Sequence, residues 1–180
     1  GRGDKVVLSC PNVPYFPIVY YGILKTGAAV VPINVLLKAP EIAYHLKDSE
    51  AKAYFCFEGT PDLPMGREGH AAIADAGVDA HFFMITADPA KPAAIEGVNT
   101  LATLMKDQAP TGSCADIDPN DTAVILYTSG TTGKPKGAEL SQSNMAMNAM
   151  TASGLLRQTA DDVHLLTLPL FHSFGSTVQM

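Results

Sequence analysis

The stretch AVILYTSGTTGKPKG, residues 123–137, decides how the rest of the chain is interpreted. Its first four residues are an unbroken apolar run, which predicts a strand buried on both faces of a parallel sheet. A long helical pattern begins near Ser141. We therefore expect Tyr127 to Gly137 to form a strand-to-helix loop in an α/β fold.

The loop contains glycines, hydroxyl side chains and two lysines. Glycines permit backbone angles that are closed to other residues and allow a ligand to come close. Successive backbone N–H groups in a turn form a concave anion site, which a nearby cation strengthens. A loop of this composition is also typical of a solvated turn, but its position after a buried strand favours a polyphosphate site. The candidate binding residues are Thr128, Ser129, Gly130, Thr131, Thr132, Gly133, Lys134 and Lys136.

The loop does not match the Walker spacing G-x-x-x-x-G-K-[ST] of nucleotide hydrolases. The residue five positions after Gly130 is Pro135, and Pro135 also follows Lys134, where the Walker loop has a hydroxyl. A phosphotransferase that uses this loop as a P-loop is therefore disfavoured.

The eleven residues from Tyr127 to Gly137 resemble the phosphate-binding signature of the adenylate-forming (AMP-binding) superfamily. This superfamily includes acyl-CoA synthetases, aryl-CoA ligases, luciferases and peptide-synthetase adenylation domains. Pro11-Asn12, residues 24–28 and residues 31–34 resemble the N-terminal part of acyl-CoA synthetases. The resemblance implies that residues 1–180 are part of one large N-terminal domain, with a mostly parallel sheet, flanking helices and an acidic linker at about residues 109–120.

Residues 168–175, LPLFHSFG, resemble the next motif of the family, which lies beside the carboxylate substrate. An isolated His172 is more typical of a turn or a packing contact, but the companion motif favours a wall of the substrate pocket. The resemblance therefore implies substrate contacts from Phe171, His172 and Gly175. The motif is most like those of fatty-acyl or aryl-CoA ligases, and the remaining histidines (His45, His70, His81 and His164) are interpreted as packing or surface residues.

In the resembled family a carboxylate attacks the α-phosphorus of ATP, pyrophosphate leaves, and coenzyme A takes the acyl group. The resemblance thus implies ATP, Mg²⁺, coenzyme A and a carboxylic acid, expected to be a fatty acid, as ligands of a full-length AMP-forming acyl-CoA synthetase. The family's Mg²⁺-binding glutamate, ribose-binding aspartate and catalytic lysine lie downstream of these residues. We therefore interpret the chain as an inactive fragment with catalytic residues outside it, and a non-catalytic nucleotide-binding α/β domain remains the alternative.

Composition excludes several other classes of protein. The chain has 180 residues, of which 47% are hydrophobic, and a formal net charge of −6, so we expect one full-sized core and no nucleic-acid partner. Cys10, Cys56 and Cys114 have neither a disulfide pattern nor a metal-ligand spacing, and a cytoplasmic location is the default. No apolar run is long enough to span a bilayer. Peripheral membrane contact and oligomeric state stay open.

The remaining pattern predicts alternating strands and helices. Residues 4–10, 28–33 and 51–57 are expected strands, separated by helices that end near Gly27 and begin near Pro40. Such alternation within about sixty residues predicts parallel strands joined by crossovers. Further expected elements are strands at 82–85 and 163–168 and helices at 68–76, at 101–105 and from Ser141, the last with a methionine-rich core face.

Overall fold

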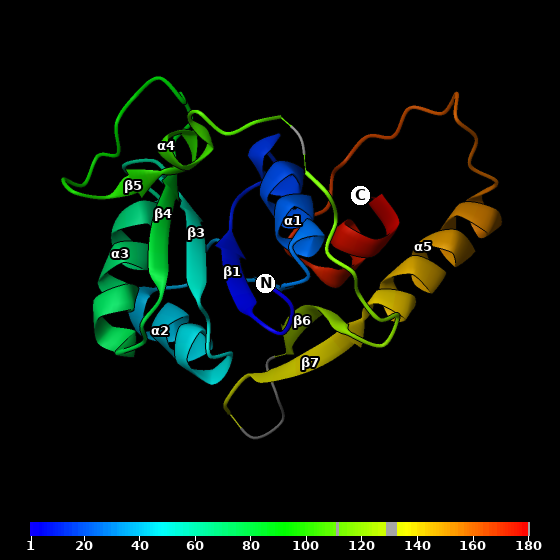
Figure 1. Ribbon diagram of the computed structural model, residues 1–180, viewed down its shortest axis with the longest axis horizontal. Coiled ribbons are helices and arrows are strands. Elements are labelled where there is room, and N and C mark those ends of the chain that lie inside the picture. The colour runs from blue at the N-terminus through cyan, green and yellow to red at the C-terminus, as the bar shows by residue number, and fades with distance from the viewer. Residues whose placement is uncertain (111, 129–132, 180) are drawn as a thin grey trace.

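The chain is described by a computed structural model that covers residues 1–110, 112–128 and 133–179 (Figure 1). Its described strands form one sheet of seven strands in the order β5-β4-β3-β1-β2-β6-β7. All neighbouring pairs are parallel except β6 and β7, which are antiparallel. The predicted mostly parallel α/β fold is confirmed. The strands are β1 (Lys5–Ser9), β2 (Ala29–Pro32), β3 (Ala53–Phe57), β4 (His81–Ile85), β5 (Asn99–Thr100), β6 (Thr122–Thr128) and β7 (Lys136–Ser141).

Helices cover both faces of the sheet. Consecutive residues of β1 point to opposite faces, so Val7 packs with α2 and α3 and Leu8 packs with α1, and both side chains are fully buried. Figure 1 shows α2 and α3 on one side of the sheet and α1 on the other. The helices are α1 (Tyr15–Lys25), α2 (Ala39–Asp48), α3 (Met65–Ala76), α4 (Leu101–Met105), α5 (Gln142–Leu156) and the π-helical turn η1 (Gly175–Gln179).

The N-terminal elements follow the sequence pattern closely. Gly27 adopts φ +80° directly after α1, as expected of a helix-ending glycine. The buried face of α1 consists of Phe16, Val19, Tyr20 and Ile23. Helix α3 begins at Met65, three residues before the expected start at residue 68.

The strands on either side of the candidate loop, β6 and β7, form a hairpin, whereas a strand-to-helix loop was expected. The strand β7 pairs antiparallel with β6, from Thr128 opposite Lys136 to Thr122 opposite Ser141. Strand β7 has no apolar run, so its sequence carries little strand signal, and its backbone hydrogen bonds to β6 define it. Helix α5 then begins at Gln142, where the Ser141 side chain accepts a hydrogen bond from the N–H of Asn144 at 3.1 Å, as the expected helix cap.

Two predictions about the C-terminal third are wrong. Residues 163–168 form no strand, and Val163 and Leu165 are 98% and 81% exposed. Figure 1 shows the connection looping out from the end of α5 and returning toward α1, and residues 163–168 pair with no described strand. His164 is accordingly exposed, although we expected it among core residues of a strand. The methionine-rich helix α5 has no fully buried residue, because no described element covers its outer face.

Candidate functional site

The predicted phosphate loop is the turn of the β6–β7 hairpin. Thr128 is the last residue of β6 and lies opposite Lys136, the first residue of β7. Both residues are exposed. The candidate residues Ser129, Gly130, Thr131 and Thr132 lie outside the described residues.

Two glycines of the hairpin are required for different physical reasons. Gly133 adopts φ +89°, a left-handed conformation that is costly for residues with a side chain. Gly137 faces Tyr127 across the hairpin, and an added Cβ would lie 2.8 Å from Cγ2 of Ile125 and 3.3 Å from Cζ of Tyr127. Gly137 therefore provides space for the Tyr127 ring.

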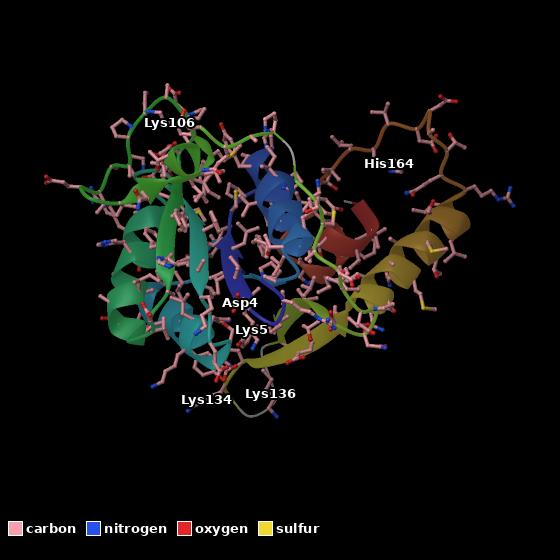
Figure 2. The ribbon with its side chains drawn as sticks, viewed as in Figure 1. Asp4, Lys5, Lys106, Lys134, Lys136 and His164 are labelled. Carbon is pink, nitrogen blue, oxygen red and sulfur yellow. The ribbon has the colours of Figure 1, made fainter. Side chains whose placement is uncertain are left out.

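The two lysines of the turn are exposed cations. Within residues 1–110, 112–128 and 133–179, no ion pair involves Lys134 or Lys136. Figure 2 shows both side chains at the tip of the hairpin, on the opposite side of the view from Lys106. Two uncompensated positive charges beside a left-handed glycine suit an incoming polyanion.

The second predicted motif is tied to the N-terminal part of the chain. The Asn12 side chain donates a hydrogen bond to the Leu168 carbonyl oxygen at 2.8 Å and accepts one from the Leu170 N–H at 2.9 Å. Leu170 is 2% exposed and Phe171 packs against the same core cluster. Sequence reasoning did not assign this role to Asn12, because a partner 156 or 158 residues away leaves no local pattern.

His172 is exposed, and its Nδ1 lies 3.4 Å from the backbone N of Phe174. Gly175 is buried, and a Cβ there would overlap the carbonyl oxygen of Pro169. Both residues thus shape a tight turn into η1. Whether His172, Phe171 and Gly175 also contact a substrate stays a prediction.

A groove of about 800 Å³ separates α5 from η1. Leu140, Met145 and Met147 line it from the α5 side, and Phe174 and Val178 line it from the η1 side. Phe171, His172 and Gly175 themselves do not line this groove. In the described part of the chain, no hydrogen bond or ion pair joins Lys134 or Lys136 to the His172 segment.

The other histidines that were interpreted as packing or surface residues have ordinary surroundings. His45 is 5% exposed, and its Nδ1 lies 2.6 Å from the Glu41 carbonyl oxygen. His70 and His81 contact the rings of Phe82 and Phe83. Cys10 and Cys56 are buried, as expected of small core residues.

Comparison with known proteins assigns the chain to a family. A protein-family model described as AMP-binding enzyme matches residues 1–180. The chain belongs to this family. The crotonobetaine/carnitine–CoA ligase of Salmonella arizonae is 35% identical over 176 residues, which cover 95% of this chain and 32% of that protein. The long-chain-fatty-acid–CoA ligase FadD13 of Mycobacterium tuberculosis is 33% identical over 174 residues, which cover 95% of this chain and 31% of that protein.

Solved structures of the AMP-binding family share the fold. The crystal structure of ATP-bound MatB from Rhodopseudomonas palustris matches with a TM-score of 0.80 and 31% identity, and the match covers 99% of this chain and 33% of that one. The chain thus spans about a third of the length of the relatives it matches.

The described residues offer neither a metal-binding cluster nor a membrane-spanning helix. They contain no group of three or more His, Cys, Asp or Glu side chains that could hold a metal ion. None of the helices in the described part of the chain is both long enough and apolar enough to traverse a bilayer.

Proposed function

We propose that this chain supplies the phosphate-binding hairpin of an AMP-forming acid–thiol ligase. The enzyme would join a carboxylate to the α-phosphorus of ATP, release pyrophosphate, and transfer the acyl group to coenzyme A. The observation that carries the proposal is the hairpin turn itself, with Gly133 in a left-handed conformation and exposed Lys134 and Lys136, in a chain of the AMP-binding family.

The hairpin would bind the leaving half of ATP. Backbone N–H groups and hydroxyls of residues 128–133 would hold the β- and γ-phosphates, and Lys134 or Lys136 would offset their charge. Offsetting this charge matters because the attacking carboxylate and the pyrophosphate are both anionic. The donor set fits polyphosphate oxygens, since it offers N–H, O–H and ammonium donors.

Mg²⁺ and coenzyme A are part of the proposed reaction, but the described residues do not fit a metal. They offer no cluster of His, Cys, Asp or Glu side chains for it. The ligands of Mg²⁺ are expected elsewhere in the full-length enzyme.

The proposed acid is a medium- or long-chain fatty acid. The groove between α5 and η1 supports an alkyl chain, because most of its larger lining side chains are apolar, among them Met145, Met147, Phe174 and Val178. Two relatives with similar sequence identity to this chain are named as ligases of different acids, one of crotonobetaine or carnitine and one of long-chain fatty acids. The choice of acid is therefore tested directly.

Carboxylate-dependent exchange of pyrophosphate into ATP tests the activity. It is measured for the 180-residue chain and for the protein that carries the remaining two thirds of a family ligase. We expect exchange only in the longer protein, with a fatty acid preferred over short and aromatic acids. Exchange by the chain alone would refute our placement of the catalytic groups. ATP binding without exchange by the longer protein would instead support a non-catalytic nucleotide-binding domain.

Lys134→Ala and Thr132→Ala test the hairpin, and Lys106→Ala serves as the control because that exposed lysine lies across the molecule (Figure 2). A hydrogen bond to a charged group contributes about 1.5–3 kcal/mol, so we expect each hairpin change to raise KM for ATP by about ten- to a hundredfold. Unchanged adenylation in both hairpin variants would remove these residues from the site.

A further inference from the structure

The last turn of α2 contacts both ends of the predicted phosphate loop. On the β6 side, the Tyr127 hydroxyl donates a hydrogen bond to Oδ2 of Asp48 at 2.7 Å. On the β7 side, the Tyr44 hydroxyl donates to the carbonyl oxygen of Pro135 at 2.8 Å. Tyr44 and Asp48 are one helical turn apart, and Tyr127 and Pro135 bracket most of the candidate phosphate-binding residues.

The Tyr127 ring is enclosed on several sides. The ring of His45 lies against it with the centroids 4.3 Å apart, and the ring of Tyr44 lies edge-on at 6.5 Å. Gly137 faces it from β7, where a larger residue would collide with the ring. His45 is itself fixed by burial and by its contact with the Glu41 carbonyl oxygen. The hydroxyl of Tyr127 therefore has few orientations open to it.

The Tyr127 hydroxyl is protonated at neutral pH and can donate to Asp48. Partial burial, the hydrogen bond to Asp48 and the negative charge of that carboxylate all raise the pKa of Tyr127 above its ordinary value of 10.0. The hydroxyl thus keeps its proton at neutral pH and remains a donor to the carboxylate.

We propose that Asp48 and Tyr44 are positioning residues that hold the two ends of the phosphate loop at the spacing ATP binding requires. Neither residue needs to touch the nucleotide. Fixing Tyr127 and Pro135 to one rigid helix removes conformational freedom from the loop before ATP arrives, so less binding energy is lost on ordering it. This inference rests on the proposed function, because it assigns residues to the same site.

The test uses the longer protein and measures KM and kcat for ATP in the pyrophosphate exchange reaction. Asp48→Ala and Tyr127→Phe each remove one partner of the same hydrogen bond, and Tyr44→Phe removes only the hydroxyl that reaches Pro135. The expected result is a three- to tenfold higher KM for ATP in each variant, because each loses one hydrogen bond, with KM for the carboxylate unchanged. Asp75→Asn, an exposed aspartate on α3, is the matched control and should have no effect.

Two further readouts separate positioning from simple stabilisation. The double variant Asp48→Ala/Tyr127→Phe should raise KM for ATP no more than Asp48→Ala alone, since Tyr127→Phe removes only a hydrogen bond that Asp48→Ala already breaks. Amide hydrogen exchange of residues 128–136 should be faster in Asp48→Ala, while exchange within the β1–β3 core is unchanged. Asp48→Asn keeps an acceptor oxygen for the Tyr127 hydroxyl, so its KM for ATP should stay close to the wild-type value.

The outcomes are distinct. If the wild-type protein shows no exchange of pyrophosphate, the proposed function fails, and the amide exchange alone then decides whether Asp48 holds the loop. If the wild-type protein is active and Asp48→Ala changes neither KM for ATP nor loop amide exchange, the inference is overturned. A lower melting temperature with KM for ATP and for the carboxylate raised equally would also overturn it, since that pattern indicates a general structural role.

Discussion

At the scale of single residues, burial raises the pKa of two of the three cysteines. Burial raises the pKa of the Cys10 thiol from 9.0 to about 12 and that of Cys56 to about 11, the latter partly offset by hydrogen bonds from Ser9 and Tyr54. Cys114 is exposed. Because thiolates are the reactive form, the two buried thiols should be inert in the folded chain.

A thiol titration checks this expectation. At pH 8 a disulfide reagent should modify only Cys114 in the native chain and all three cysteines in denaturant. The control is the folded Cys114→Ser variant. If its Cys10 or Cys56 reacts rapidly, the core around these thiols is accessible to the reagent.

The same two thiols make stability depend on alkaline pH. A raised folded pKa means that the native state binds more protons than the unfolded state between about pH 9 and the folded values. The contribution of these two thiols to the free energy of unfolding should therefore be constant below pH 9 and fall by up to about 1.4 kcal/mol per pH unit and per thiol above it. Urea midpoints at pH 8, 9 and 10 measure this fall. Cys10→Ala should reduce the slope, and an unchanged slope would contradict the assignment.

Gly175 is a second residue whose role depends on its surroundings. A methyl group at this position would overlap the Pro169 carbonyl oxygen, so Gly175→Ala should destabilise the turn that leads into η1. We expect a loss of about 1–3 kcal/mol, the usual cost of overpacking, measured by urea unfolding. Stability equal to the wild type would mean that this turn relaxes freely.

At the scale of elements, two helical glycines should respond oppositely to alanine. Gly22 in α1 has no heavy atom within 4 Å of an added Cβ, so Gly22→Ala should stabilise the chain by about 0.5–1 kcal/mol through helix propensity. Gly69 in α3 would place its Cβ 2.9 Å from Sγ of Cys56 and 3.0 Å from the Tyr54 hydroxyl, so Gly69→Ala should destabilise it. Thermal unfolding of both variants measures the difference, and shifts of the same sign would contradict the packing described here.

The β6–β7 hairpin shows which elements a local pattern can reveal. Strand β6 is an apolar run and was predicted, and Ser141 was predicted as a helix cap. Strand β7 was not, because its residues are mostly exposed and only their pairing with β6 makes them a strand. The predicted phosphate loop therefore connects the two strands of a hairpin and not a strand to a helix.

At the scale of the whole molecule, apolar surface is concentrated in the C-terminal third. Met150 and Leu155 on α5 are 74% and 79% exposed, and Val163 and Leu165 follow in the extended connection. Exposed apolar patches of this kind mark contacts with other protein segments. The 180-residue chain should therefore bind a hydrophobic fluorescent dye and self-associate.

The variant Met150→Gln/Leu155→Gln tests this at constant fold. It should lower both dye fluorescence and the sedimentation-derived mass, while the melting temperature stays within the error of the wild type because neither side chain is buried. Exposed Ile18→Gln on α1 is the control for loss of a single apolar group elsewhere. If the double variant binds as much dye as the wild type, the apolar surface that binds the dye lies elsewhere in the chain.

The sequence by itself determined the α/β class, the positions of β1 to β4, β6 and most helices, and the family, because buried strands, helix caps and the loop 127–137 are local patterns. Tertiary structure alone decided that β7 is a strand, that 163–168 is not, and that Asn12, Tyr44 and Asp48 hold the two motifs from distant parts of the chain. The physical reason is that a strand needs a neighbour and a hydrogen bond needs a partner. Partners separated by 79 to 158 residues leave no periodicity for local reasoning to detect.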